Sequence, residues 1–372
     1  METLGIDVGF GFTKASNGNN RVLFKSIIGD YADIQFRSEL EEPSSTQNLQ
    51  VTIEDQSYFV GDLAEQQSSF RQFTLDQSKL LTDFVQILAL TAAGLCAEDG
   101  HAINVVSGLP VGYFKQDAKK FKDILTGSHQ ITFHQRGGGK NTKNIQINKV
   151  KMVPQPLGSL INLLMDENGK IIDRQLAKQK IGIVDIGFRT TDFILCDQLK
   201  YIDRGSSTVK NGISNCFSII ADKLRQQSGV NVELYRLYKA VRKGSIKIKG
   251  SEYSLVNLRD KVYAHAAGKL ANEINRLWAD DWDIDSIILT GGGSMELYTH
   301  LHPLIEGHVI PVEKGDDTRF NNVLGYIKYG KYEQKKLSVQ NPTTEASANE
   351  QQEKAENKIT RSKGLAWMKK HG

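Results

Sequence analysis

The stretch from Gly5 to Lys14 limits the possible folds of this 372-residue chain more than any other. Leu4 to Val8 is short, apolar and interrupted only by Asp7, which is typical of a buried strand. Gly9 and Gly11 then open a turn. Because glycine has no Cβ and tolerates positive φ, successive backbone N–H groups in such a turn can converge on an anion. The stretch therefore predicts a phosphate-binding hairpin, and a glycine-bearing turn beside a solvated Asp7 is the alternative.

Side chains beside this turn suit the same ligand. Lys14 adds a mobile positive charge, and Thr13 adds a hydroxyl. The carboxylate of Asp7 would be repelled by phosphate, but it can act through Mg²⁺, which favours carboxylates together with phosphate oxygens.

A second stretch repeats the plan about half a chain later. Residues 181–192 contain an apolar strand, then Asp185, Gly187, the aromatic Phe188 and two threonines. A third apolar strand, 286–290, ends in three consecutive glycines, on which a ring or a sugar could lie directly against the backbone. Two such hairpins predict duplicated halves that face each other across one nucleotide.

These three stretches resemble, in order, the phosphate 1, phosphate 2 and adenosine motifs of the actin superfamily of ATPases, which includes sugar kinases, heat-shock chaperones and actins. Residues 152–160 and 320–326 resemble the two connecting helices of that superfamily. The five motifs cover residues 1 to about 330. The resemblance implies an α/β, actin-like ATPase fold in which two α/β domains flank a nucleotide cleft and the connecting helices form a hinge.

The resemblance also implies the ligand and its contacts. The nucleotide would be ATP, with GTP as the alternative, and Asp7 and Asp185 would hold Mg²⁺. Phe10 and Phe188 differ from the small or polar residues of actin and are similar to aromatic positions in some prokaryotic and archaeal relatives. Arg189 would meet phosphate or pair instead with Asp192. The implied nucleotide contacts are Gly9, Phe10, Gly11, Phe12, Thr13, Lys14, Gly187, Phe188, Arg189, Thr190, Lys210, Asn211, Gly291, Gly292, Gly293 and Ser294.

Two residues are implied to act in hydrolysis. Gln155 stands at the start of the first connecting helix, where hydrolytic relatives place an acid or amide near the γ-phosphate. An amide is a poor base but can orient water, and phosphoryl transfer depends mostly on orientation and charge stabilisation. Asp185 would hold a metal-bound or attacking water. The alternative for Gln155 is a polar helix-capping residue.

We expect domain I over residues 1–150, with a variable subdomain at about 31–74, and domain II over 151–335. A final helix at about 321–335 would return toward domain I, and 336–372 would be a disordered tail because it is polar. Its last residues, including Trp367, form a basic-aromatic terminus that would dock to a partner or simply be solvated.

Local patterns predict further elements within these domains. Helices are expected at Thr82–Leu95 and Val262–Trp278, and hairpins at 129–150 and 246–253. The loop Arg136–Lys140 belongs to the first hairpin rather than to a phosphate loop, since its spacing does not match G-x-x-x-x-G-K-[ST].

Charge and cysteine content exclude several classes of protein. The net charge is +4, of which residues 336–372 contribute +3 (seven basic and four acidic), leaving +1 for the rest. That balance disfavours a broad nucleic-acid surface, so no direct sequence-specific DNA binding is expected. Cys96, Cys196 and Cys216 lack disulfide or metal-ligand spacing. No apolar run reaches the ~18 residues of a membrane helix. We therefore expect a cytoplasmic protein without a membrane span.

The length and motifs favour one branch of the superfamily. No sugar-binding set is evident, and only a short tail follows the ATPase motifs. Stretches such as Val60–Ala64 and Ser107–Pro110 resemble bacterial and archaeal actin-like proteins of the plasmid-segregation (ParM) type. The first hypothesis is an ATPase that polymerises head to tail into cytomotive filaments, with an adaptor protein on centromere-like DNA as its partner. The second is a non-polymerising nucleotide-dependent switch or adaptor of the same fold, and the third is a small-molecule kinase.

Overall fold

The computed structural model describes residues 2–32, 46–135, 138–310 and 317–340. The chain forms two compact units, 1–330 and 331–372. The described part of the second unit continues helix α10 (Asn321–Gln340), so this helix runs five residues past the predicted boundary at 335. Parts of the predicted subdomain and of the loop at 136–140, and the tail beyond 340, lie outside the described residues. Over the described ranges, no helix is both long and apolar enough to cross a membrane.

The first sheet carries the first predicted hairpin near one edge. Its strand order is β3-β2-β1-β8-β10-β9-β5-β6-β4-β7, in which β1, β8 and β10 run parallel. The strands are β1 (Glu2–Val8), β2 (Phe12–Ser16), β3 (Arg21–Lys25), β4 (Ile28–Asp30), β5 (Leu49–Ile53), β6 (Gln56–Val60), β7 (Arg71–Gln72), β8 (Ala102–Leu109), β9 (Gly127–His134) and β10 (Lys140–Pro154). The predicted hairpin at 129–150 is confirmed, since β9 and β10 pair antiparallel.

Strands from the predicted subdomain extend this sheet rather than forming a separate one. β5 pairs with β9, with Val51 opposite Phe133, and β6, β4 and β7 follow. The short helices α1 (Asp62–Gln67) and α2 (Gln77–Leu80) flank these strands in sequence. The described residues between 31 and 74 are therefore continuous with the sheet that carries the first hairpin.

Helix α3 (Asp83–Cys96) confirms the prediction for Thr82–Leu95. Thr82 precedes the helix and its Oγ1 accepts a hydrogen bond from the Phe84 N–H, which satisfies one of the free donors of the first turn. Apolar side chains such as Val85 and Leu88 are fully buried against the first sheet. Helix α4 (Val111–Leu125) follows β8 directly.

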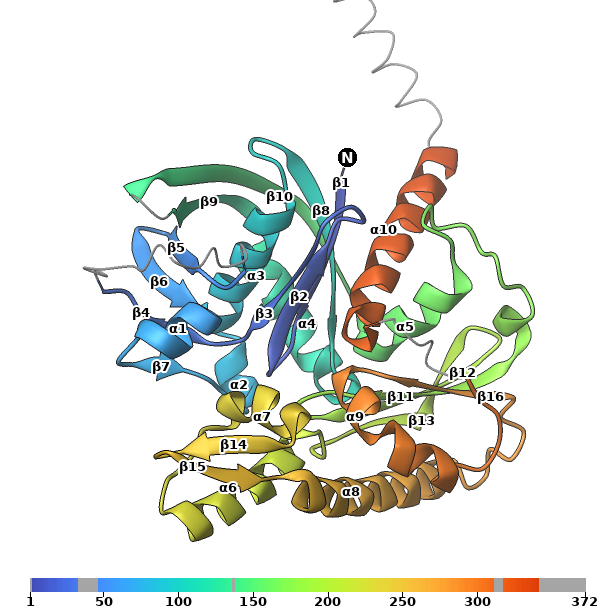
Figure 1. The fold of residues 1–372 in the computed structure, drawn as a ribbon. Helices are drawn as coiled ribbons and strands as arrows, with labels where there is room; N and C mark the ends of the chain where they lie inside the picture. Colours follow the sequence, from blue (N-terminus) through green and yellow to red (C-terminus); the bar gives the residue numbers. More distant parts are fainter. Residues whose placement is uncertain (1, 33–45, 136–137, 311–316, 341–372) are drawn as a thin grey trace, which may run out of the picture. The chain divides into compact units, whose positions relative to one another are not determined.

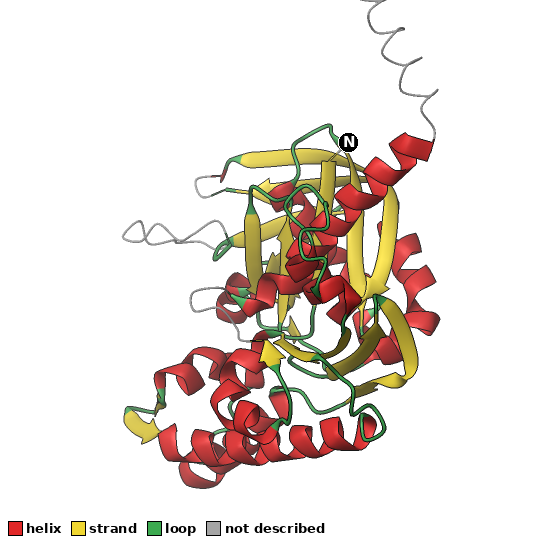
Figure 2. Ribbon diagram, turned by 90° about the vertical axis from the view of Figure 1, so that its right-hand side faces the viewer, coloured by secondary structure: helices red, strands yellow, loops and turns green. Residues whose placement is uncertain are grey.

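The second sheet carries the second hairpin. Its order is β13-β12-β11-β16-β17, and β11, β16 and β17 run parallel. These strands are β11 (Lys180–Ile186), β12 (Thr191–Asp197), β13 (Lys200–Val209), β16 (Ser286–Thr290) and β17 (Val309–Ile310). Helices pack around the strands of both sheets (Figures 1 and 2). The chain is thus an α/β protein, as predicted.

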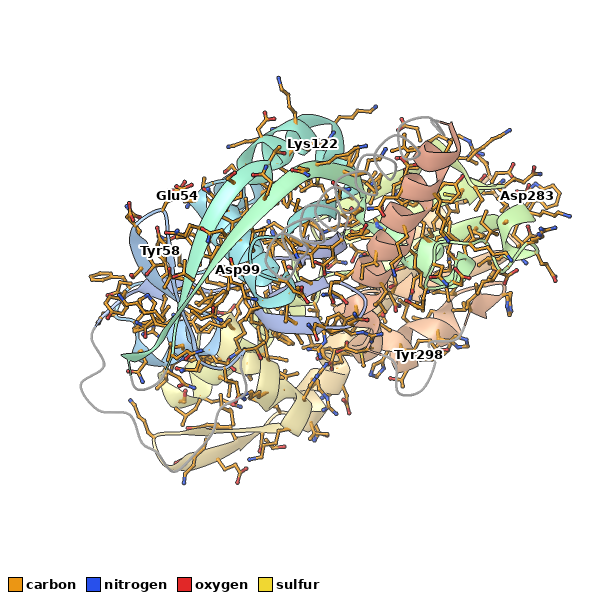
Figure 3. The ribbon with its side chains drawn as sticks, turned by 90° about the horizontal axis from the view of Figure 1, so that it is seen from above. Glu54, Tyr58, Asp99, Lys122, Asp283 and Tyr298 are labelled. Carbon is orange, nitrogen blue, oxygen red and sulfur yellow. The ribbon has the colours of Figure 1, made fainter. Side chains whose placement is uncertain are left out.

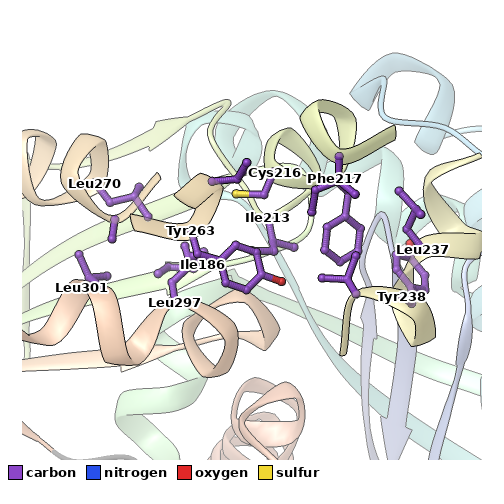
Figure 4. Close-up of a cluster of buried hydrophobic side chains, with 14 of the residues drawn as sticks. Ile186, Ile213, Cys216, Phe217, Leu237, Tyr238, Tyr263, Leu270, Leu297 and Leu301 are labelled. Atoms are coloured by element: carbon purple, nitrogen blue, oxygen red, sulfur yellow. The ribbon is translucent and has the colours of Figure 1, made fainter. Parts of the chain in front are cut away.

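Helices and a small hairpin complete the second half of the chain. The helices are α6 (Ser214–Ser228), α7 (Leu237–Lys243), α8 (Val256–Leu277) and α9 (Gly292–Leu301), with a short 3₁₀ turn, η3 (Leu234–Arg236). Their apolar faces share one buried cluster with the second sheet, which includes Ile186, Phe217 and Leu297 (Figure 4). The hairpin β14 (Ser245–Ile248) and β15 (Ser251–Ser254) confirms the prediction for 246–253, whereas α8 begins six residues before the predicted Val262.

Two helices cross at glycines, and this crossing positions part of the site. Helix α5 (Gln155–Leu164) and helix α10 approach so closely that a Cβ on Gly325 would lie 1.8 Å from the Gly158 carbonyl oxygen. A Cβ on Gly158 would in turn lie 2.6 Å from the Asn322 carbonyl oxygen. Both separations are far below contact distance, so the crossing requires glycine at both positions.

Candidate functional site

The two predicted hairpins have the same register. In the first, Val8 pairs with Thr13 and Asp7 with Lys14. In the second, Ile186 pairs with Thr191 and Asp185 with Asp192. Each turn therefore contains four residues, and each is closed by a backbone hydrogen bond, from Gly9 N to Phe12 O (3.1 Å) and from Gly187 N to Thr190 O (2.9 Å). The repeat seen in the sequence is thus a repeat of backbone geometry.

Asp7 lies at the end of β1 and has a partner on each carboxylate oxygen. Lys14 Nζ lies 2.7 Å from Oδ2, and the side-chain amide of Gln155 donates to Oδ1 at 2.9 Å. Gln155 is the first residue of α5, so the first hairpin and the first connecting helix meet at this carboxylate. The predicted neighbourhood of Asp7, Lys14 and Gln155 is therefore present. Helix α5 has no side-chain hydrogen bond at its N-cap, Pro154, so the alternative capping role of Gln155 is not seen in this structure.

Asp185 is buried at the end of β11 and contacts the other connecting helix. Asn322 Nδ2 donates to its Oδ2 at 2.6 Å, while Asn322 Oδ1 accepts from the Ser159 hydroxyl (2.7 Å) and backbone N–H (3.1 Å) on α5. Burial raises the pKa of Asp185 to about 6, the nearby charge of Asp7 adds to this, and the Asn322 bond opposes it. Asn322 thus joins both crossing helices to Asp185.

The glycine run after β16 lies directly against Asp185. Gly291 has φ +84°, and a Cβ there would lie 2.2 Å from Asp185 Oδ1, so only glycine fits. Helix α9 begins at Gly292, and its first N–H groups lie at a cavity rather than under a side-chain cap. A helix N-terminus of this kind favours a polar or anionic ligand group.

A single cavity of about 400 Å³ joins these parts. Six basic side chains and four acidic ones line it, which suits a polyanionic ligand. Of the predicted residues, the following line it: Asp7, Gly9, Phe10, Gly11, Phe12, Lys14, Gln155, Asp185, Gly187, Phe188, Arg189, Thr190, Gly291, Gly292 and Gly293.

Four predicted contacts do not line this cavity. Thr13 is buried, with its hydroxyl 3.0 Å from that of Ser26, and Ser294 donates its hydroxyl to Gly291 O at 2.7 Å. Lys210 lines a neighbouring cavity, and the Asn211 carbonyl accepts from Thr191 Oγ1 at 2.8 Å. In this structure these residues support the cavity walls or lie beside them.

Several cavity residues were not predicted. Lys239 and Arg242 come from α7, and Arg242 Nε lies 2.8 Å from a Glu296 oxygen on α9. Arg319 lies 5.6 Å from the centre of the Phe12 ring. Arg319 and Asn322 border or belong to the second connecting motif, so proximity to that motif was their only sequence signal. Lys239 and Arg242 of α7 had no such signal in the sequence.

Tyr238 of α7 is an aromatic residue of the cavity that was not predicted. Its ring packs 4.8 Å from Phe12 and 5.1 Å from Phe188, so it contacts both hairpins. Its hydroxyl is buried and has no hydrogen-bond partner among the residues that the structure describes. The aromatic residues Phe12 and Phe188 of the two turns are thus brought together through α7.

Asp192, which the sequence offered as a partner for Arg189, has a different role. Its carboxylate accepts from the Val111 N–H at 2.8 Å and from the hydroxyls of Thr208 and Thr190, so it caps helix α4. Arg189 instead donates from Nε to the Leu75 carbonyl at 2.8 Å. Burial raises the pKa of Asp192 to about 7, and the hydrogen bond from Thr208 opposes the shift.

The donor set is compatible with a divalent cation bound together with phosphate. Within the described ranges, no group of three or more His, Cys, Asp or Glu side chains could hold a metal by itself. Asp7 and Asp185 both face the cavity, and the charge of Asp7 contributes to the raised pKa of Asp185. Mg²⁺ commonly uses one or two carboxylates, with phosphate oxygens and waters completing its shell.

Comparisons with known proteins agree with this geometry. Residues 5–158 match the family model for the N-terminal domain of actin-like proteins, and residues 183–303 match the C-terminal domain of the archaeal MreB-like actin homologue. No curated protein matches the sequence.

Three solved structures illustrate the similarity. A non-polymerisable quadruple mutant of pCBH ParM is 25% identical, with TM-score 0.75, over 89% of this chain and 99% of that one. A 15-stranded ParM filament from Clostridium botulinum has 25% identity and TM-score 0.74 over the same shares. The archaeal actin homologue Ta0583 in complex with ADP has 19% identity and TM-score 0.73, again over 89% and 99%.

The two sheets, paired hairpins and crossed helices therefore constitute an actin-like fold. With its actin-like N-terminal and MreB-like C-terminal domains, the chain belongs to the actin-like protein family, as its motifs predicted.

Proposed function

We propose that this protein binds ATP with Mg²⁺ in the central cavity, hydrolyses it, and polymerises head to tail into cytomotive filaments. The observation that carries the proposal is the convergence of Asp7, Gln155 and Asp185, from two hairpins of equal register and one connecting helix, on one cavity. The predicted domains, 1–150 and 151–335, would then close around the nucleotide.

The nucleotide has a natural orientation in this cavity. The backbone N–H groups of Phe10 and Gly11 and of Phe188 and Arg189 would receive the phosphates, because the Gly9 and Gly187 amides close the turns and leave the following amides to face the ligand. Lys14 lies 2.7 Å from Asp7 and would turn toward phosphate when the ligand enters. The nucleoside would lie toward Gly291–Gly293 and the guanidinium groups of Arg242 and Arg319.

Hydrolysis would depend on residues that hold a water in line with the γ-phosphate. Gln155 is oriented by its bond to Asp7, and Asp185 by its bond to Asn322. Mg²⁺, when bound with ATP, would neutralise charge that develops on the phosphate oxygens. With an amide in place of a strong base, the rate would come from positioning, and a misplacement of about 1 Å costs roughly 10²-fold.

The proposal of filament formation is supported by a similar protein rather than by the cavity. The similar Clostridium botulinum ParM structure is a filament. We propose that this chain likewise associates with itself in the cytoplasm, and that plasmid DNA is its cargo, held through an adaptor protein on centromere-like DNA. Light scattering with and without that adaptor would test the partner.

The first test is pelleting of the purified protein with ATP, ADP or no nucleotide, with released phosphate measured in the same tubes. Asp185→Ala and Gln155→Ala are expected to bind ATP but to release phosphate at least about 10²-fold more slowly, and Gln155→Ala filaments should persist longer. If ATP is bound and hydrolysed but nothing pellets across salt and protein concentration, the protein is a nucleotide-dependent switch. Phosphate release without any acceptor would argue against a small-molecule kinase.

A further inference from the structure

The two most exposed aromatic side chains of the described residues lie at opposite ends of the first unit. Trp282 is 90% exposed and Phe70 is 80% exposed. Phe70 is joined to β4 by two hydrogen bonds with Asp30, which pairs in register with Tyr58. In Figure 3 Tyr58 lies at one end of the unit and Asp283, the neighbour of Trp282, lies at the other.

The loop that carries Trp282 is held rigidly. Asp281 is buried and accepts two hydrogen bonds from Arg204, at 2.7 and 2.6 Å, and one contact from Lys180 at 2.8 Å. Lys180 also forms an ion pair with Asp283, the residue that follows Trp282 in the sequence. A rigid, protruding Trp loses little conformational entropy on binding, and Trp is among the residues most enriched at the energetic centres of interfaces.

A groove lies beside Phe70 at the opposite end. Its volume is about 580 Å³, and its lining residues are Ser69, Arg71, Phe73, Leu75, Glu233, Leu234 and Tyr235. The rings of Phe73 and Tyr235 meet edge to face at 5.4 Å and form an apolar wall. Arg71 adds a guanidinium, which donates to the Glu65 carbonyl at 3.2 Å. The groove thus combines apolar and aromatic walls with the cation Arg71 and with Glu233, whose carboxylate pairs with Arg236 at 3.6 Å.

We propose that Trp282 of a second copy of this chain occupies the groove beside Phe70. The acidic residues around the indole, Asp280, Asp283 and Asp285, are exposed and complement Arg71. Because the indole and the groove are different surfaces of one unit, the contact is heterologous, and it generates an open polymer when the rotation between subunits does not close a ring. The inference rests on the proposed function and names the residues through which its subunits join.

The groove also connects this contact to the nucleotide cavity. One of its walls comes from the segment after β7 and the other from η3, directly before α7. Phe73 packs on Tyr235 at 5.4 Å and on Phe188 of the second hairpin at 6.1 Å. Opening of the cavity would separate these walls, so the groove is complete only when the cavity is closed. Docking of Trp282 would therefore respond to the state of the bound nucleotide.

Sedimentation of the full chain with ATP tests the contact. Trp282→Ala is expected to raise the concentration needed for assembly at least about 30-fold, the equivalent of a ~2 kcal/mol energetic centre, and Trp282→Phe is expected to recover part of this loss. Since the indole is exposed, the variant should keep the melting temperature and the ATP affinity of the wild type. The matched control is Ile219→Ala, which truncates a side chain that is 47% exposed on α6 and should assemble normally.

Cross-linking tests whether this groove is the surface that binds Trp282 of a second copy. The three natural cysteines are buried, so Asp280→Cys, beside the intact indole, and Ser69→Cys, at the groove, introduce thiols at the two proposed surfaces without removing the docking side chains. A mixture of the two variants should form a disulfide-linked dimer with ATP, whereas either variant alone should not. If the wild type assembles and Trp282→Ala assembles equally well, or if no mixed dimer forms, the docking inference is wrong while the proposed function stands. If the wild type itself never assembles with ATP, both are wrong.

Discussion

Replacement of Asp192 by Asn should stabilise the protein at pH 8. The carboxyl group is 3% exposed and its pKa is raised to about 7 by burial, against an ordinary value of 3.8. Three pH units correspond to about 4 kcal/mol of cost for ionising this group in the folded chain. An amide avoids that cost but gives up one acceptor position, which is worth about 1–2 kcal/mol. The expected net gain at pH 8 is therefore about 2–3 kcal/mol.

The pH dependence of this gain is its most specific feature. Between pH 3.8 and about 7 the folded state holds more protons at Asp192 than the unfolded state does, so the stability of the wild type falls as pH rises. The variant lacks this contribution. The stability difference between the two should shrink by about 3 kcal/mol from pH 8 to pH 5.

Urea unfolding at pH 5, 6, 7 and 8, followed by the fluorescence of the buried Trp278, measures the difference in unfolding free energy between the wild type and Asp192→Asn. Asp197→Asn, an exposed change at the end of the same strand, is the control and should show no pH-dependent difference. An Asp192→Asn protein that is less stable than wild type at pH 8, or whose stability difference is constant with pH, would refute the argument from burial.

Four further substitutions have defined outcomes in the same unfolding assay. Asn322→Ala should cost about 2–4 kcal/mol and slow phosphate release, because it leaves the buried Asp185 without its donor; unchanged stability would contradict the bridging role. Gly325→Ala should cost more than about 2 kcal/mol through overpacking at the helix crossing, whereas Gly268→Ala, with open space around it in α8, should gain about 0.5–1 kcal/mol. Tyr238→Phe should not destabilise the protein, since the buried hydroxyl has no partner to lose; a lower melting temperature would point to a bound water or ligand.

The hairpins could be predicted because their signals are local. Strand, acid, glycine and aromatic residue follow one another within ten positions, and the structure gives both copies one register. The alternation of side chains along a strand explains why Thr13, predicted as a nucleotide contact, does not line the cavity. Successive side chains of a strand point to opposite faces, so Thr13 and Lys14 on β2 cannot both face the cavity. Lys14 faces it and Thr13 lies in the interior.

The remaining residues of the site are positioned by contacts between residues far apart in the sequence, which no local pattern indicates. Gln155 meets Asp7 across 148 positions, and Asn322 meets Asp185 across 137. Arg242 reaches the cavity from a short helix with no motif of its own. Which side of such a helix faces a ligand is decided by packing against distant elements, so one sequence without its fold does not identify these residues.

The cap of helix α4 has a consequence for biosynthesis. Pro110 offers no side-chain cap of its own, and the carboxylate that receives the Val111 N–H is 81 positions further along the chain. At a translation rate of roughly 5–20 residues per second, the ribosome needs about 4–16 s to reach Asp192 after Val111. During that interval the start of α4 has only water as a partner. The N-terminus of α4 is therefore capped only after Asp192 has been synthesised. A ribosome stalled between Val111 and Asp192 would present an incompletely folded chain to chaperones.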